Sequence, residues 1–233
     1  MLDPSPYPYA SPTPAAVAYV RDVLHGLDAL WFLSGGWAAD AWLGRQTREH
    51  GDVDITVFHD DQRAVFEHLS GWALVAHDPN VPDDTTEQWN GRHLDLPAHI
   101  HVPTSNSTLS TSPARTHSAY EFEVLLNGRA GRSWVLNGKA AIAVPVDIST
   151  RLSPWGVPTA PPEVVIFFKA DAHLTAAEIA GSGGAPRPRD EQDFFALLTT
   201  LTDAARAWLH QSIAAVRPQH PWLPHLLGTA LSD

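Results

Sequence analysis

The pattern of apolar and polar positions predicts helices and strands in alternation near the start of the chain. Apolar side chains in residues 15–27 recur at the spacing of one helix face. Residues 30–33 are an apolar strand, and a short helix is expected over residues 37–43. Gly44 ends this helix, because glycine tolerates the left-handed conformation just past a helix C-terminus. After a polar turn, residues 52–57 predict a second strand.

The middle of the chain is predicted to supply mainly strands. The first expected elements are a helix over residues 60–69, a strand over 72–76 and a hairpin over 88–102. They are followed by a strand over 120–127, a strand over 133–136 that runs back beside it, and a last strand over 140–146. The hairpin is predicted from Asn90-Gly91, a dipeptide typical of two-residue turns between strands. Residues 103–116 are rich in Ser, Thr and Pro and are expected to form a mobile loop.

The C-terminal part of the chain has a different pattern from about Ser153 onward. Prolines between residues 154 and 162 mark a linker, after which helices are expected over 163–174, 190–201 and 203–216. The pattern predicts an α/β N-terminal half and a helical C-terminal half. We therefore divide the chain into a disordered Pro-rich arm over residues 1–14, a first domain over residues 15–150 and a helical domain over residues 160–233.

The junction between the first predicted strand and the following helix carries a Gly-Gly pair, Gly35-Gly36. Two glycines let backbone N–H groups approach an anion, and the helix N-terminus adds the positive end of its dipole. Asp52 and Asp54 lie two residues apart at a strand start, so their side chains share a face. Two such carboxylates repel unless a cation lies between them, and Mg²⁺ prefers oxygen ligands. This layout indicates a site for a nucleoside triphosphate and Mg²⁺.

Gly-Gly, then a helix, then Asp-x-Asp resembles the signature of the nucleotidyltransferases of the DNA polymerase beta superfamily. More narrowly, the stretch is similar to the aminoglycoside and lincosamide nucleotidyltransferases. The residues that carry this similarity are Gly35-Gly36-Trp37-Ala38 with Asp40, and Leu43-Gly44-Arg45-Gln46-Thr47-Arg48-Glu49-His50-Gly51-Asp52-Val53-Asp54-Ile55.

The resemblance implies an α+β fold. A polymerase-beta-like nucleotidyltransferase domain, a small mixed sheet with helices, would occupy residues 15–150, followed by the helical C-terminal domain. The resemblance also implies that Ser34, Gly35 and Gly36 bind the triphosphate and that Asp52 and Asp54 bind Mg²⁺ and are catalytic.

A third carboxylate is needed to complete a site of this type. One candidate is Glu123, because an acid inside an apolar strand is costly to bury without a cation or donor. The other is Asp95, whose distance from Asp54 resembles that in one aminoglycoside adenylyltransferase branch. We prefer Glu123 as catalytic and metal-binding residue because its strand is better formed, and Asp95 stays the alternative catalytic residue.

Basic residues of the C-terminal half extend the resemblance. Residues 160–170 are similar to the family's Pro-Glu-x-x-x-x-x-Lys helix, and residues 187–194 to its Arg-Pro-Lys-Asp-x-x-Asp-Phe segment. The resemblance implies that Lys169, Arg187 and Arg189 face the triphosphate. Arg189 stands where the family usually has Lys, and residues 171–185 are an insert.

Four other residues are open to two interpretations. Arg48 is expected to hold an acid or to reach a phosphate, and Asp40 is expected to pair with a basic residue rather than bind substrate. His50 is expected to orient the backbone of its turn rather than to be catalytic. Asp193 is either part of the basic cleft segment or an acid on a helix surface.

His99 and His101 share a strand face and could bind a transition metal, but the sequence identifies no third ligand.

Composition narrows the classes of partner. The 233 residues contain no cysteine, which excludes disulfides and thiolate zinc sites and is compatible with the cytoplasm, where we expect the protein. A net charge of −11 disfavours nucleic acid and favours a cationic small molecule. We expect no signal peptide and no membrane segment, because no apolar run approaches the roughly 20 residues that a spanning helix needs.

These observations together predict an enzyme that moves a nucleoside monophosphate, expected to be AMP from ATP or another NTP, onto a hydroxyl of a small-molecule acceptor. The resemblance implies an aminoglycoside or lincosamide antibiotic as acceptor. The alternatives are a protein AMPylating enzyme, an enzyme acting on an RNA end, and a non-catalytic nucleotide-binding module. The intact Gly-Gly and Asp-x-Asp argue against the last of these. We expect a monomer or a homodimer.

Overall fold

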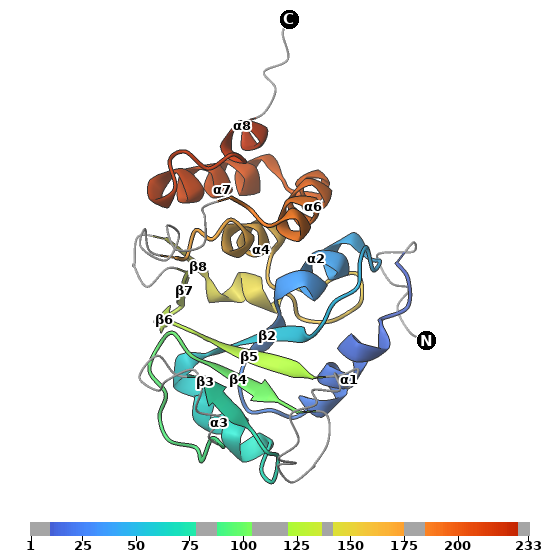
Figure 1. Ribbon diagram of the computed structural model, residues 1–233, viewed down its shortest axis with the longest axis vertical. Coiled ribbons are helices and arrows are strands. Elements are labelled where there is room, and N and C mark those ends of the chain that lie inside the picture. Colours follow the sequence, from blue (N-terminus) through green and yellow to red (C-terminus); the bar gives the residue numbers. More distant parts are fainter. Residues whose placement is uncertain (1–9, 78–87, 104–120, 137–141, 175–184, 228–233) are drawn as a thin grey trace, which may run out of the picture.

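A five-stranded mixed sheet with the strand order β1-β2-β5-β4-β3 underlies the N-terminal half (Figure 1). Its strands are β1 (Trp31–Leu33), β2 (Val53–Phe58), β3 (Val75–His77), β4 (His99–Val102) and β5 (Phe122–Asn127). β2 and β5 run parallel, and the other neighbours are antiparallel. The computed structural model describes residues 10–77, 88–103, 121–136, 142–174 and 185–227.

The two faces of this sheet differ in polarity, because side chains alternate along each strand. Ile55 in β2, Val124 in β5 and Ile100 in β4 lie in one row and are fully buried. The neighbouring row, Asp54, Glu123 and His101, projects to the opposite face and is only partly buried. One face of the sheet is therefore core, and the other carries ionisable groups.

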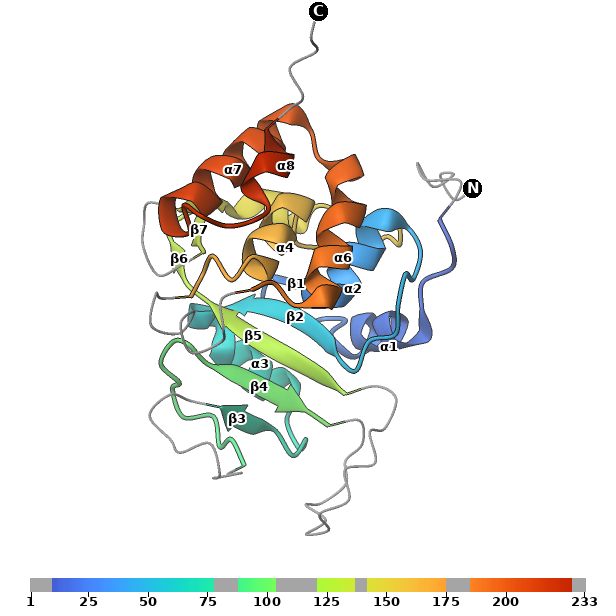
Figure 2. The ribbon, with the colours of Figure 1, turned by 45° about the horizontal axis from the view of Figure 1, so that its top comes forward.

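Helices α1 (Ala15–Val23) and α3 (Gln62–His68) lie against the apolar face (Figures 1 and 2). Val17 and Val20 of α1 and Val65 of α3 are buried in the core. The two helices are linked where Nε2 of His68 lies 2.8 Å from the carbonyl oxygen of Val23. This layer leaves the polar face of the sheet to the remaining helices.

A helical layer covers part of the polar face (Figure 2). It contains α2 (Gly35–Leu43), α4 (Pro162–Lys169), α6 (Pro188–Leu197), α7 (Asp203–Val216) and α8 (Leu223–Leu226). α2 packs against α4 and α6, and α7 packs against α4 and α8. Within the described ranges, every helix is too short or too polar to span a lipid bilayer.

The segment before α4 is tied to the edge of the sheet. The backbone N–H of Leu33 donates to the carbonyl of Pro158 at 2.8 Å, and the N–H of Ala160 donates back to Leu33 at 2.9 Å. The indole of Trp42 in α2 also donates to the carbonyl of Ala160. These bonds place the start of α4 beside the turn between β1 and α2.

A second, three-stranded sheet consists of β6 (Arg129–Ala130), β7 (Ser133–Val135) and β8 (Ala143–Pro145). Its central residue, Trp134, is 1% exposed and packs its ring 4.8 Å from that of Phe32 and 6.0 Å from that of Phe168. The sequence pattern predicted strands over residues 133–136 and 140–146, which correspond to β7 and β8, but it predicted no strand at β6, which begins at Arg129.

The α+β fold is confirmed, and several elements match the sequence pattern closely. Ser34 has an extended backbone at the N-terminus of α2, and Gly44 ends that helix with φ +66°. α7 has its expected limits, with the Thr202 hydroxyl accepting from the N–H of Ala205. The helix predicted over residues 163–174 ends earlier, at Lys169. The mobile loop predicted over residues 103–116 and the start of the arm, residues 1–9, lie almost wholly outside the described residues.

The predicted hairpin over residues 88–102 is wrong. β4 pairs with β3 and β5 instead, and residues 90–98 form a loop. Trp89 and Leu94 are buried in the core beside α3, where the Leu94 N–H donates to the side-chain oxygen of Gln62 at 2.8 Å. Burial of these two side chains outweighs the local turn preference of Asn90-Gly91.

The helical layer should depend on the contact between Phe194 of α6 and Trp222, whose rings stack 4.3 Å apart. Phe194→Ala removes a side chain that is 0% exposed, and we expect a loss of about 3–5 kcal/mol in the free energy of unfolding. Phe195→Ala is the matched control, because Phe195 is 45% exposed, and it should cost less than about 1 kcal/mol. Urea unfolding measures both, and equal losses would contradict this account of the layer.

Candidate active site

The turn between β1 and α2 lies directly over the start of β2. The backbone N–H of Ser34 donates to the carbonyl of Asp54 at 2.8 Å, and the hydroxyls of Ser34 and Thr56 lie 2.7 Å apart. Gly35 has φ +62°, and a side chain there would collide with the Asp54 carboxylate. A side chain at Gly36 would collide with Arg48 and His50. Glycine is therefore required at both positions, and the N–H groups at the start of α2 stay accessible from the cavity.

Three carboxylates converge beside this turn. Asp54 in β2 pairs in register with Glu123 in β5, and Asp52 lies just before β2. One oxygen atom from each of Asp52, Asp54 and Glu123 lies within 4.8 Å of the other two. The parallel pairing of β2 with β5 thus brings together acids 69 and 71 positions apart in the chain.

Burial and the proximity of these acids raise the pKa of two of them. Burial, followed by the charge of Asp52, raises the pKa of Asp54 to about 6. Burial, followed by the charges of Asp54, Asp52 and Glu121, raises the pKa of Glu123 to about 7. The anionic cluster is therefore strained in the absence of a cation. Three converging carboxylate oxygens fit a hard divalent cation such as Mg²⁺.

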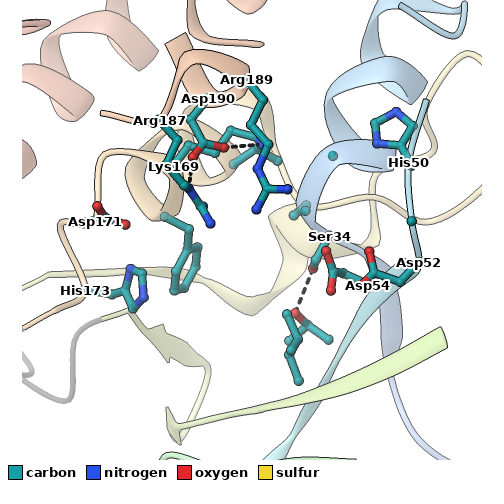
Figure 3. Close-up of a pocket in the computed structure, with 18 of the residues that line it drawn as sticks. Ser34, His50, Asp52, Asp54, Lys169, Asp171, His173, Arg187, Arg189 and Asp190 are labelled. Carbon is teal, nitrogen blue, oxygen red and sulfur yellow. Dashed lines mark hydrogen bonds and ion pairs between the residues drawn. The ribbon is translucent and has the colours of Figure 1, made fainter. Parts of the chain in front are cut away.

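Basic side chains form the opposite wall of the site (Figure 3). Lys169 from the end of α4 lies 2.7 Å from Asp193 and 3.0 Å from Asp190, both on α6. Arg48 binds Asp193 through two nitrogens, at 2.9 and 3.2 Å, and Arg187 binds Asp190 at 2.5 Å. Arg189 also lines the cavity. Asp171 lines the cavity on the same side. The four cations Arg48, Lys169, Arg187 and Arg189 against the three carboxylates of Asp171, Asp190 and Asp193 leave this wall with an excess of positive charge.

The buried carboxylate of Asp193 joins the two halves of the molecule. It is 1% exposed and contacts Arg48, which follows α2, and Lys169, which ends α4. Burial alone would raise its pKa, but the hydrogen bonds and charges of Arg48 and Lys169 outweigh burial, so the pKa lies below its ordinary value. Asp193 is thus held ionised between two cations, which identifies it as part of the site framework and not a surface acid.

A cavity of about 500 Å³ separates the two charged walls. The turn at Ser34, Gly35 and Gly36, with Asp52 and Asp54, forms one side, and Lys169, Arg187 and Arg189 form the other (Figure 3). Apolar and aromatic residues also contribute to the lining, namely Leu125, Trp134, Ala160, Val165 and Phe168, with His173. The volume is ordinary for a small-molecule site.

Asp40 organises the loop that leads to Asp52. It is fully buried, its carboxylate lies 2.6 Å from Nε2 of His50, and it accepts from the hydroxyl and the backbone N–H of Thr47. The ring of His50 packs 4.3 Å from that of Trp37. Asp40 therefore pairs with a histidine and supports the loop that carries Arg48.

The structure does not bring Asp95 into the cluster. Asp95 is exposed and follows Leu94, whose carbonyl lies 2.6 Å from Nε2 of His59, just past the C-terminal end of β2. Asp54 is near the N-terminal end of the same strand. Glu123, not Asp95, is the acid that the fold places beside Asp52 and Asp54.

Sequence reasoning missed several residues of the site. Asp190 is one, and its spacing of three from Asp193 on a predicted helix could have marked a shared face. Trp134, Phe168 and His173 line the cavity, but the sequence around each of them contains no motif that would have indicated a place in the site.

The sequence model of the aminoglycoside-2''-adenylyltransferase family matches residues 16–138, which include the Gly-Gly turn and all three carboxylates. A lincosamide resistance protein from Staphylococcus haemolyticus is 31% identical over 61 residues, which make up 25% of this chain and 38% of that protein. The matched segment thus spans well under half the length of this curated relative.

Two solved structures share the fold. The solution structure of the antibiotic-resistance factor ANT(2'')-Ia is 15% identical, covers 90% of this chain and 94% of its own, and has a TM-score of 0.50. The crystal structure of ANT(2'')-Ia with adenylyl-2''-tobramycin is 13% identical, with 85% and 95% coverage and the same TM-score. The family match extends over more than half of the chain, and this protein therefore belongs to the aminoglycoside-2''-adenylyltransferase family.

Proposed function

We propose that this protein is a Mg²⁺-dependent nucleotidyltransferase that moves AMP from ATP onto a hydroxyl of an aminoglycoside or lincosamide antibiotic. The observation that carries the proposal is a three-carboxylate cluster of which two members, Asp52 and Asp54, line the cavity opposite a cationic wall. A triphosphate with its metal is the ligand that needs both. Family membership supports the same reaction, and the names of the relatives support the acceptor class.

The triphosphate is assigned to the space between the β1–α2 turn and the basic wall. The N–H groups of Gly35 and Gly36 at the start of α2 donate to phosphate oxygens there. Lys169, Arg187 and Arg189 neutralise the remaining charge from the other side. Arg48 acts through Asp193, because its Nε and Nη2 already donate to that carboxylate and its Nη1 donates to the carbonyl of Glu49.

Asp52, Asp54 and Glu123 are the proposed Mg²⁺ ligands. Bound there, Mg²⁺ would draw electron density from the reacting phosphate and from the departing oxygen. The acceptor hydroxyl oxygen forms a bond to the α-phosphorus, the bond to pyrophosphate breaks, and the hydroxyl proton passes to Glu123. The basic wall holds pyrophosphate as it leaves. The net charge of −11 favours a cationic acceptor over a nucleic acid.

Removing any one of the three carboxylates should abolish transfer. We expect Asp54→Asn and Glu123→Gln to lower kcat/KM at least about 100-fold, because the metal loses a charged ligand. Asp95→Asn, which changes the other sequence candidate, should keep full activity. Mass spectrometry of tobramycin and lincomycin incubated with ATP and Mg²⁺ detects the added AMP. Wild-type protein that adenylylates neither compound would reject the acceptor class, and full activity of Asp54→Asn would reject the metal site.

The raised pKa of Glu123 predicts how stability depends on pH without metal. In the unfolded chain this pKa is about 4.3, and in the folded protein it is about 7. The folded state therefore binds more protons between these values, and its stability falls as the pH rises from about 4 to about 7. At pH 8 in EDTA, Glu123→Gln should unfold with a free energy about 1–2 kcal/mol higher than wild type.

The same variant supplies its own control. At pH 4, where Glu123 is protonated in the folded state and mostly protonated in the unfolded state, the two proteins should differ by less than about 0.5 kcal/mol in urea unfolding. Added Mg²⁺ at pH 8 should stabilise wild type more than Glu123→Gln, because only wild type keeps all three ligands. A Glu123→Gln protein that is less stable than wild type at pH 8 in EDTA would contradict the repulsion within the cluster.

A further inference from the structure

Three histidines gather on the polar face of the sheet, beyond the carboxylate cluster. His77 ends β3, and His99 and His101 lie two residues apart in β4. The register pairs His77 directly with His99, so all three side chains project from the same face. Their ring centroids are 4.6 Å apart for His77 and His99, 4.6 Å for His77 and His101, and 5.2 Å for His99 and His101. His77 is the third ligand that sequence reasoning lacked.

We propose that His77, His99 and His101 bind a divalent transition-metal ion of the Zn²⁺ class. One ring nitrogen of each lies within 4.8 Å of the other two, and all three residues are partly buried. Zn–N bonds of about 2.0–2.1 Å in a tetrahedral site put ligand nitrogens roughly 3.3 Å apart, so binding requires the rings to rotate until their nitrogens reach that spacing. Three imidazoles with a fourth position open to water are an established ligand set for Zn²⁺.

The contact of His101 with Glu123 supports this site. Nε2 of His101 lies 3.1 Å from Oε1 of Glu123. A histidine that binds metal through one ring nitrogen usually donates its other N–H to a carboxylate, which orients the ring and makes it a better ligand. With Nε2 directed to Glu123, Nδ1 is the nitrogen assigned to the metal. The carboxylate that the proposed function assigns to Mg²⁺ would thus also support the histidine site.

The two metal sites differ in ligand chemistry. Carboxylate oxygens select Mg²⁺, whereas imidazole nitrogens select Zn²⁺ and related ions. The histidine site does not depend on the proposed function, because its ligands lie on β3 and β4 and are separate from Asp52 and Asp54. The shared contact through Glu123 means that an ion bound at the histidines acts on a residue of the carboxylate cluster.

Calorimetric titration of the full, untagged chain with zinc chloride at pH 7.5 tests the proposal. We expect one Zn²⁺ per chain in wild type. His99→Gln and His77→Gln should each weaken binding at least about tenfold, a change of about 1.4 kcal/mol or more in binding free energy. His25→Gln is the matched control, since His25 is exposed near the end of α1, and it should bind Zn²⁺ as wild type does.

A double variant, Asp52→Asn with Asp54→Asn, separates the two clusters. Zn²⁺ binding retained there and lost in His99→Gln supports the histidine site. Zn²⁺ binding lost in the double variant and unchanged in His99→Gln would overturn it, as would wild type without measurable binding. Melting curves in EDTA show whether each variant folds. If His99→Gln does not fold, His77→Gln at the end of the edge strand β3 decides, and its unchanged affinity would reject the site.

Discussion

The site depends on one buried charge network, in which Asp193 lies between Arg48 and Lys169. A carboxylate that is 1% exposed is tolerated only because two cations bind it. Those cations come from the loop after α2 and from the end of α4, so the network joins the sheet half to the helical half. Loss of either cation would leave this carboxylate with a single partner in a nearly dry position. The network therefore sets the position of α6 and, with it, of Arg187 and Arg189.

The opposite wall has the reverse property, because three like charges lie beside one another there and no cation forms an ion pair with Asp52 or Asp54 among the described residues. Asp52, Asp54 and Glu123 converge within 4.8 Å, and burial with mutual repulsion raises the pKa values of Asp54 and Glu123. Such a cluster costs free energy in the empty protein, and a bound cation removes that cost. One wall lacks positive charge and the other has an excess of it, so the cavity is complementary to a metal–triphosphate complex. The carboxylate cluster thus lowers the stability of the empty protein at the place where the fold can bind a metal ion.

Local patterns predicted the parts of this structure that depend on neighbouring residues. Gly44 was expected to end α2, Asp52 and Asp54 to share a face, and a helix to run over residues 203–216, all from spacings of a few positions. The hairpin at Asn90-Gly91 failed because Trp89 and Leu94 gain more from burial beside α3 than the turn gains from its preferred backbone.

Contacts distant in sequence were beyond such reasoning. Asp193 lies 145 positions from Arg48, and nothing near either residue shows that they meet. The choice between Glu123 and Asp95 likewise needed the register of β2 with β5, and the third histidine needed the pairing of β3 with β4. The pairing of the strands decides both the third carboxylate and the third histidine, and a single sequence does not show which strands pair.

The central claim is that the carboxylate cluster and the basic wall bind a metal–triphosphate complex together. Calorimetric titration with a non-hydrolysable ATP analogue, in Mg²⁺ and then in EDTA, tests it most directly for wild type and Asp54→Ala. The account predicts binding by wild type in Mg²⁺, with a large loss of affinity in EDTA and in the variant. Equal affinity in all these conditions, or no binding by wild type in Mg²⁺, would contradict it.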